Sequence, residues 1–278
     1  MIKKLTLLFL FLGFRAVLAG NVVPDLASPV PNSGILSAPK NVIKFNLSGL
    51  AFKNFAFQAE RAIWKPFSFA LGYSLMPKRY LPSVIENQLP SDSIFTAVKS
   101  FNYSSHSITP EIRFYPGGFI KGAPKGFYLA PYARYSVTKI AMTAPDITYA
   151  SVDAAGVTTM ITEKITIEGS SKGLAFGMLI GSQWIIGQHF SIDWFILGGH
   201  TGTGTISVQS KSSMNVPSSA VPAFESAVND KLSNIESKIP MKLVSDLKAT
   251  ITPHDVIIKG NSKVIGIRAA GINIGFAF

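Results

Sequence analysis

The sequence predicts an all-β fold in which eight antiparallel strands close into a transmembrane β-barrel, with long loops on one rim and one amphipathic helix in the last loop. Three observations predict it. Bulky and small residues alternate over many segments, which is typical of strands with two unlike faces. Charged residues make up only 15% of the chain, although hydrophobic residues make up 47%. The connections between the predicted strands also sort into a short set and a long set.

The N-terminal residues predict a secretory signal peptide. Lys3 and Lys4 precede an apolar run, and Val17-Leu18-Ala19 forms a relaxed small-residue cleavage site. The apolar run is too short for a spanning helix, which needs about 20 residues. The chain therefore divides into a signal peptide at 1–19, a flexible tail at 20–39 and a barrel domain at 40–278, whose last loop, 199–262, contains a helix at 222–239.

Alternation predicts the eight strands one by one. The third is the clearest, because Phe67, Phe69 and Leu71 lie opposite Ser68 and Ala70. The last strand ends in Phe278, with bulky residues at even positions and Asn, Gly and Ala between them. The predicted strands are 41–50, 54–63, 67–75, 104–115, 126–138, 172–185, 188–198 and 263–278.

The connections support a membrane barrel. Three of them are long, at 76–103, 139–171 and 199–262, and they fall on one rim, whereas the opposite rim has shorter turns. Outer-membrane barrels have short periplasmic turns and long outer loops, and eight is the smallest common strand number. The tail is then expected in the periplasm. Trp64, Tyr115, Tyr135, Trp184 and Trp194 lie near predicted strand ends, where aromatic girdles form.

The last loop contains a predicted amphipathic helix over 222–239. Phe224, Val228, Leu232, Ile235 and Ile239 follow one another at spacings of four, four, three and four. Two roles are open for its apolar stripe: it covers the barrel mouth or other loops, or it contacts a partner or the membrane surface.

The polar face of the strands places a balanced set of charges in the lumen. Ion pairs between such residues avoid the cost of isolated buried charges. Arg268 shares parity with the lipid-facing Ile272, so it joins the set only if a bulge at Gly266 or at 269–271 changes the register. The predicted lumenal charge network is Lys44, Glu60, Glu111, Arg113, Arg134 and Asp193, with Arg268 as a conditional member.

No constellation of catalytic or metal-binding residues is predicted. His106 lies beside Ser105 and Ser107, which leaves a lipid deacylase as an alternative, but no acid is placed to orient the imidazole. The histidines lack metal-site spacing, so neither a metal nor a cofactor is expected. The net charge of +11 falls to +8 when Lys3, Lys4 and Arg15 leave with the signal peptide. No basic and aromatic cluster suggests nucleic acid.

The leading hypothesis is a monomeric, non-enzymatic outer-membrane barrel of structural or binding type. Its lumen is closed by charge pairs, and its outer loops contact lipid, lipopolysaccharide, a protein or a ligand. The alternatives are a lipid-modifying hydrolase with a His/Ser site on the rim, a small pore, and a soluble lipocalin-like carrier whose aromatic face would line a cavity.

Short motifs resemble a family of uncharacterised exported barrels of Bacteroidetes type, and the general architecture resembles the small OmpA- and OmpX-type barrels. The resemblance covers the first five strands and the last, and it implies a fold and a location but no activity. The motifs are Lys40 to Asn46, Gln58 to Ala62, Phe67 to Tyr73, Glu111 to Tyr115 and Gly271 to Phe276.

Overall fold

The computed structural model describes residues 39–80, 101–143, 146–210, 216–238, 243–268 and 270–278, which belong to one compact unit. The predicted signal peptide and, except for Pro39, the predicted tail lie outside the described residues. Most of the predicted loop 76–103 lies outside them too. Among the described residues, no helix has the length and apolar character needed to cross a membrane.

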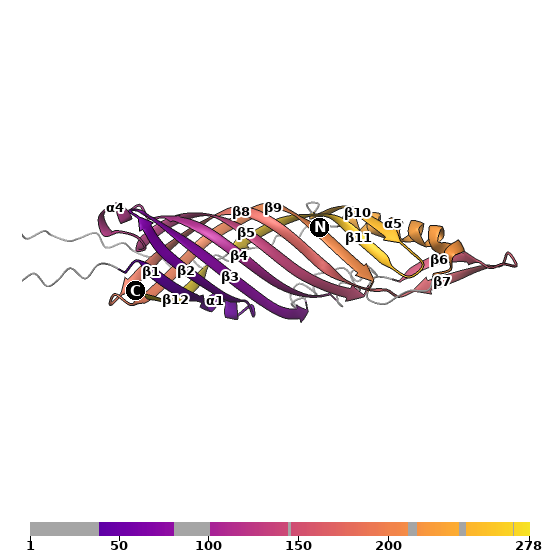
Figure 1. Ribbon diagram of the computed structural model, residues 1–278, viewed down its shortest axis with the longest axis horizontal. Coiled ribbons are helices and arrows are strands. Elements are labelled where there is room, and N and C mark those ends of the chain that lie inside the picture. Colours follow the sequence, from indigo (N-terminus) through magenta and orange to yellow (C-terminus); the bar gives the residue numbers. More distant parts are fainter. Residues whose placement is uncertain (1–38, 81–100, 144–145, 211–215, 239–242, 269) are drawn as a thin grey trace, which may run out of the picture. The chain divides into compact units, whose positions relative to one another are not determined.

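Eight strands hydrogen-bond in a closed antiparallel ring (Figure 1). The chain is all-β in this sense, and the ring closes where the last strand pairs with the first. Around the ring, the strands are β1 (Asn41–Asn46), β2 (Phe55–Trp64), β3 (Phe67–Tyr80), β4 (Asn102–Phe114), β5 (Gly126–Thr143), β8 (Thr166–Ile186), β9 (Phe190–Ser210) and β12 (Gly271–Ala277).

The predicted eighth strand is divided in two. β11 (Val256–Arg268) pairs with residues 198–209 of β9, and β12 pairs with residues 190–195 of the same strand. The end of the ring to which β9 runs, where residues 198–209 lie, is called the upper end. Burial shows that Arg268 faces inward in β11, whereas Ile272 faces outward in β12. The inward parity therefore changes between 268 and 271, which is one of the two positions that the sequence suggests for a bulge.

The first strand is shorter than predicted. β1 ends at Asn46, and residues 47–50 form the short helix α1 (Leu47–Leu50) instead of more strand. The side-chain oxygen of Asn46 accepts a hydrogen bond from the amide of Gly49, which caps this turn. A second short helix, α4 (Gly118–Lys121), connects β4 to β5.

Two of the predicted long loops are largely regular structure. β5 and β9 continue past their predicted ends at 138 and 198, and β8 begins before its predicted start at 172. In addition, β10 (Val244–Ile251) pairs with β11. Residues 139–171 also contain a separate hairpin, β6 (Ile147–Val152) and β7 (Thr158–Glu163). The assignment of 139–171 and 199–262 as loops was therefore wrong for much of their length.

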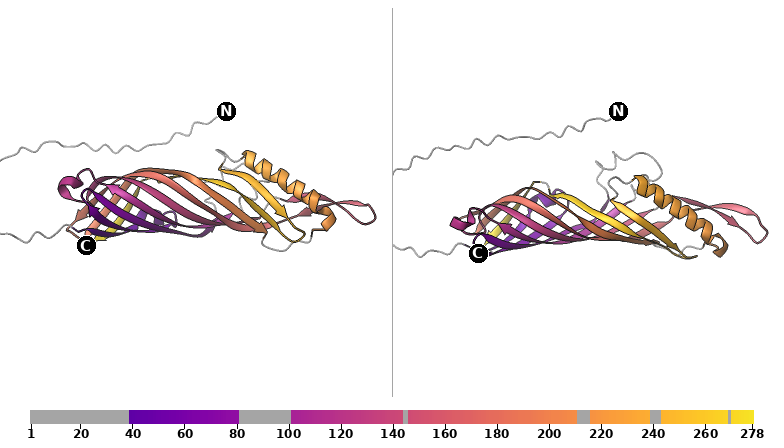
Figure 2. Two further views of the ribbon diagram at one scale, coloured as in Figure 1. Left: turned by 45° about the horizontal axis from the view of Figure 1, so that its top comes forward. Right: turned by 90° about the horizontal axis from the view of Figure 1, so that it is seen from above.

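The predicted helix is present as α5 (Val221–Lys238), directly after a 3-10 turn, η1 (Ser218–Ala220). Figure 2 shows it beside β10 and β11. Phe224, Val228 and Leu232 are buried in a core shared with β6, the extended part of β9 and β11. The Phe224 and Tyr149 rings lie 4.9 Å apart between centroids. Of the two roles left open, the structure shows these three residues of the stripe covered by the chain itself, whereas Ile239 lies outside the described residues.

The two faces of the ring differ as the alternation predicts. Bulky apolar side chains point outward and remain exposed, with exposed fractions of about half in Phe57, Leu71 and Ile112. Trp64, Tyr135, Trp184 and Trp194 share this outer face. Tyr115 does not: it is fully buried inside, so its assignment to the outer girdle was wrong.

Candidate functional site

A cluster of charged side chains fills the middle of the ring, and Lys44 is at its centre. The Lys44 Nζ atom lies 2.5 Å from Glu60 Oε2 and 2.8 Å from Asp193 Oδ2. It also donates to Gln183 Oε1 at 2.6 Å. These partners come from β2, β9 and β8, so the contacts of a single ammonium group connect distant parts of the ring.

Arg113 makes a second set of contacts in the same cluster. Its Nη1 atom lies 2.9 Å from Asp193 Oδ2 and 3.2 Å from Glu60 Oε2. Its Nη2 atom lies 3.0 Å from Glu111 Oε2 and donates to Gln58 Oε1 at 2.8 Å. Arg113 is only 1% exposed, so the fixed geometry of the guanidinium group serves three carboxylates away from water.

Hydroxyl groups complete the coordination of the carboxylates. Tyr115 and Ser68 donate to Glu60 Oε1 at 2.6 and 2.5 Å. Tyr128 donates to Asp193 Oδ1 at 2.7 Å, and its ring lies 4.3 Å from Arg113 Cζ. Buried charges with this many partners meet the condition under which ion pairs are tolerated in a protein interior.

Arg268 extends the cluster upward. Its Nη1 atom lies 2.6 Å from Glu111 Oε1, and its guanidinium group lies against the rings of Tyr132 and Phe195, at 5.1 and 5.3 Å. The break between β11 and β12 is what directs this side chain into the interior. Three cations, Lys44, Arg113 and Arg268, thus oppose the three carboxylates of Glu60, Glu111 and Asp193.

Arg134 is not brought into these ion pairs. Glu111 is paired with Tyr132 across β4 and β5, so Arg134 lies one inward position further along β5. Its closest polar contact is Ser74 Oγ, at 3.5 Å, and no carboxylate among the described residues lies within ion-pair distance of it. Arg134 therefore points inward as predicted, but it lies too far along β5 to join the predicted network of ion pairs.

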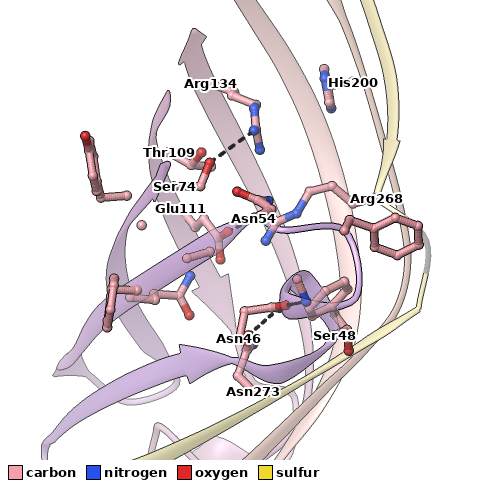
Figure 3. Close-up of a pocket in the computed structure, with 18 of the residues that line it drawn as sticks. Asn46, Ser48, Asn54, Ser74, Thr109, Glu111, Arg134, His200, Arg268 and Asn273 are labelled. Atoms are coloured by element: carbon pink, nitrogen blue, oxygen red, sulfur yellow. Dashed lines mark hydrogen bonds and ion pairs between the residues drawn. The ribbon is translucent and has the colours of Figure 1, made fainter. Parts of the chain in front are cut away.

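Above the cluster lies a cavity of about 450 Å³. Figure 3 shows Arg134 and His200 at the top of the view, with Glu111, Asn54 and Arg268 below them. The Tyr132 hydroxyl and His200 Nδ1 lie 3.0 Å apart. The remaining lining has amide and hydroxyl side chains on one hand, and a larger apolar part on the other, which includes Phe52, Phe195 and Ile267.

Among the described residues, His106 has neither a nucleophile nor an acid as a hydrogen-bond partner. It lies in the middle of β4, with Leu75 and Val137 as its strand partners. Ser105 and Ser107 point to the opposite face, where they contact Thr138 and Ser74 at 3.0 and 2.8 Å. Within the described part of the chain, no hydrogen bond joins His106 to a hydroxyl or a carboxylate, and no His, Asp and Glu side chains gather as a metal site would require.

Several members of the cluster were not among the predicted site residues. Gln183 and Tyr128 have the inward parity of their strands, so alternation alone assigns them to the interior. Tyr115 has the same parity as Glu111 and Arg113 and lies at the end of the predicted strand 104–115, so alternation assigns it to the interior as well. Ser68 has the same size and parity as the other small inward residues, so the sequence alone does not identify it as a hydrogen-bond donor to Glu60.

No protein-family model matches the chain, and no curated protein sequence matches it. The family resemblance noted from the short motifs therefore stays a prediction. Among solved structures, the chain is similar to the crystal structure of the N-terminal β-barrel domain of Pseudomonas aeruginosa OprF. The identity is 11%, the match covers 86% of this chain and 98% of that chain, and the TM-score is 0.25. A likeness at this level carries no argument, so the function is inferred from the geometry.

Proposed function

We propose that the chain is an outer-membrane β-barrel of structural or binding type, with a lumen closed by ion pairs. One observation carries the proposal: a closed ring of strands has an apolar exterior and a charged, hydrogen-bonded interior. Closure leaves no unpaired strand edge around the ring, which is a requirement for strands that cross a membrane. A soluble carrier would have the reverse arrangement of faces, with an apolar cavity and a polar exterior.

The extent of the apolar exterior fits a bilayer. On β8 it reaches from Leu174 to Ile186, a height of roughly 28 Å at the rise and tilt typical of such strands. Above Leu197 the exposed face of β9 becomes polar, with Thr201 and Thr203. The apolar surface is therefore a band, as contact with lipid requires, and it does not continue along the whole length of the strands.

The interior contacts favour a closed lumen over a small pore. Lys44 and Arg113 contact side chains from several strands at about the same height, and the Tyr115 and Tyr128 rings pack beside them. Small eight-stranded barrels have interiors that side chains just fill. A pore would need a continuous water path through this cluster.

The strands that extend beyond the apolar band, with α5 and the β6–β7 hairpin, supply the binding surface in this proposal. They would lie outside the cell and contact lipopolysaccharide, a protein or a ligand, and the barrel would act as a monomer. A rigid scaffold that presents exposed segments is where recognition commonly occurs. The hydrolase alternative has no support at His106.

Cell fractionation and gel mobility test the membrane proposal. We expect the mature chain in the outer-membrane fraction, with a difference in mobility between unheated and boiled samples that reports a folded barrel. Recovery of the folded chain as a soluble monomer without detergent would contradict the proposal.

Planar-bilayer recording tests the closed lumen. The purified protein should give no large, steady conductance. A stable ohmic current that depends on its concentration would show that water and ions pass the cluster, and would favour the pore alternative.

A further inference from the structure

The cavity above the charge cluster has an excess of positive charge. Below it, the three cations and three carboxylates of the cluster balance one another. Glu111, the acidic side chain in the lining, already contacts both Arg113 and Arg268, at 3.0 and 2.6 Å. Arg134 adds one more cation, and no carboxylate among the described residues accompanies it. The interior at this height therefore lacks one negative charge.

The groups around Arg134 are suited to an oxyanion with a polar body. Ser74 and Thr109 place hydroxyl groups near it, and His200 and Arg268 face the same space (Figure 3). A guanidinium group binds carboxylate and phosphate oxygens through paired hydrogen bonds. The side-chain amide of Asn54 in the lining can bind a hydroxyl group of a ligand, whereas the Asn46 amide is already hydrogen-bonded to Asn273 and to the Gly49 amide. A volume of about 450 Å³ lies within the range of small-molecule sites.

The architecture puts this cavity at a low part of the wall. β2 begins at Phe55, which pairs with Leu75, whereas β3 continues to Tyr80. β1 ends at Asn46, and α1 follows it beside the cavity. The described wall is therefore shorter here than at β8 and β9, and a ligand can approach from the side on which the long strands extend.

We propose that this cavity binds a small polar organic anion, whose carboxylate or phosphate group pairs with Arg134. The inference depends on the interior geometry and not on the membrane location or on the outer binding surface. Its failure is therefore distinguishable from a failure of the proposed function, which gel mobility and fractionation test separately.

Calorimetric titration of the full mature chain in neutral detergent tests the site. The probes are gluconate and inorganic phosphate, and sorbitol serves as a neutral probe with a polar body like that of gluconate. We expect saturable binding of at least one anion and none of sorbitol. In Arg134→Gln the affinity for that anion should fall by about tenfold or more, which is the effect of losing a hydrogen-bonded charge pair.

Lys139→Gln is the matched control, because it removes one positive charge from an exposed position on the same strand. It should keep the affinity of the unaltered protein, and the gel mobility shift shows that both variants are folded. The proposal is overturned if neither anion binds, if Arg134→Gln binds as well as the unaltered protein, or if Lys139→Gln weakens binding equally.

The same oxyanion chemistry occurs in free solutes and in lipid headgroups. Nanodiscs of phosphatidylcholine, with and without phosphatidic acid, distinguish these sources. Competition by phosphatidic acid against the bound anion would support the site and assign it to a headgroup. Unchanged binding in both nanodiscs would support the site and assign it to a free solute.

Discussion

Lys44 holds two carboxylates and an amide inside the ring, so its removal tests how far the charge cluster supports the fold. In Lys44→Met, Glu60 and Asp193 lose their closest cationic partner while staying buried. We expect the free energy of unfolding to fall by about 3–5 kcal/mol, which is the cost of leaving a buried charge without its partner.

The measurement is urea unfolding in detergent, followed by gel mobility and tryptophan fluorescence. Lys139→Met is the control, because it removes an exposed lysine with the same change in charge. A cost below about 1 kcal/mol for Lys44→Met, as for a surface pair, would mean that water or another group replaces the ammonium.

Gly271 begins β12 against the ring of Phe195. A Cβ atom at Gly271 would clash with the Phe195 ring, with Cζ as the nearest atom and both Cε atoms at 2.8 Å. Gly271→Ala should therefore destabilise the protein by about 1–3 kcal/mol through overpacking. In a double-mutant cycle with Phe195→Leu, the combined cost should be less than the sum of the two single costs.

Gly199→Ala is the matched control for this experiment. A Cβ atom there would have only the Gly266 carbonyl oxygen nearby, at 3.9 Å, so this variant should unfold as the unaltered protein does. Strict additivity of Gly271→Ala and Phe195→Leu would show that the ring is not the obstacle.

The sequence predicts which side chains of the candidate site point inward, but not their positions along the barrel axis. Alternation places Lys44, Glu60 and Arg134 on the inward face, because successive side chains of a strand point to opposite sides. Which of them meet depends on the stagger between strands, and the sequence does not give that stagger. Arg134 was grouped with the ion pairs for this reason. Tyr115 was placed on the outer face because it lies near a strand end, although it shares the inward parity of Glu111 and Arg113.

At the scale of elements, α5 belongs to a second core beyond the charged interior. Phe224 is fully buried there, beside Tyr149 and Val228. Phe224→Ala should destabilise this region by about 3–5 kcal/mol, the range measured for aromatic truncations in cores. The ring should remain folded, since among the described residues of its strands this core contacts only the extended parts of β5, β8 and β9 and not the charged interior.

Hydrogen exchange resolved by peptide separates the two effects. Exchange should become faster in 221–238 and 244–251, and stay slow in β3 and β4. Glu225→Ala changes the neighbouring exposed residue and should leave both rates unaltered. Equal acceleration in β3 and β4 would show that the two regions unfold together.

The upper parts of the long strands show why predicted strand ends were too early. Along β9, the exposed residues change from Phe190 and Trp194 to Thr201, Thr203 and Thr205, and glycines lie between the threonines. Alternation is still present there, but the difference in hydrophobicity between the two faces is small. The pattern that identifies a strand with one apolar face is therefore lost where the apolar band ends.

At the scale of the whole molecule, the ring does not depend on β10 or α5 for its closure. Gln209 pairs with Ile257 across β9 and β11, so a direct hairpin can join these strands. Replacing residues 211–255 with Asn-Gly, a favoured two-residue turn, should leave a chain that still shows the gel mobility shift. Loss of the shift would mean that the second core is needed for the ring to form.

The general fold and the helix α5 were predictable, but β10 and the β6–β7 hairpin were not. Alternation and loop lengths gave eight antiparallel strands, and the ring has eight. Those features reflect an environment that acts on every strand alike. The hairpin β6–β7 depends on local contacts of one segment, which no repeated pattern predicts, whereas the parity of Arg268 did indicate a break near 269–271.

The pairing of β1 with β12 has a consequence for how the chain folds. The amide of Asn41 donates to the carbonyl oxygen of Phe278 at 2.9 Å, and the Phe278 amide donates back to Asn41 at 2.9 Å. The final ladder thus joins residues that are 237 positions apart in the sequence. Such contacts slow folding, because the entropy of loop closure must be lost before they form. Until β12 has been translated, β1 has an open edge, which is a site where another chain could pair with it.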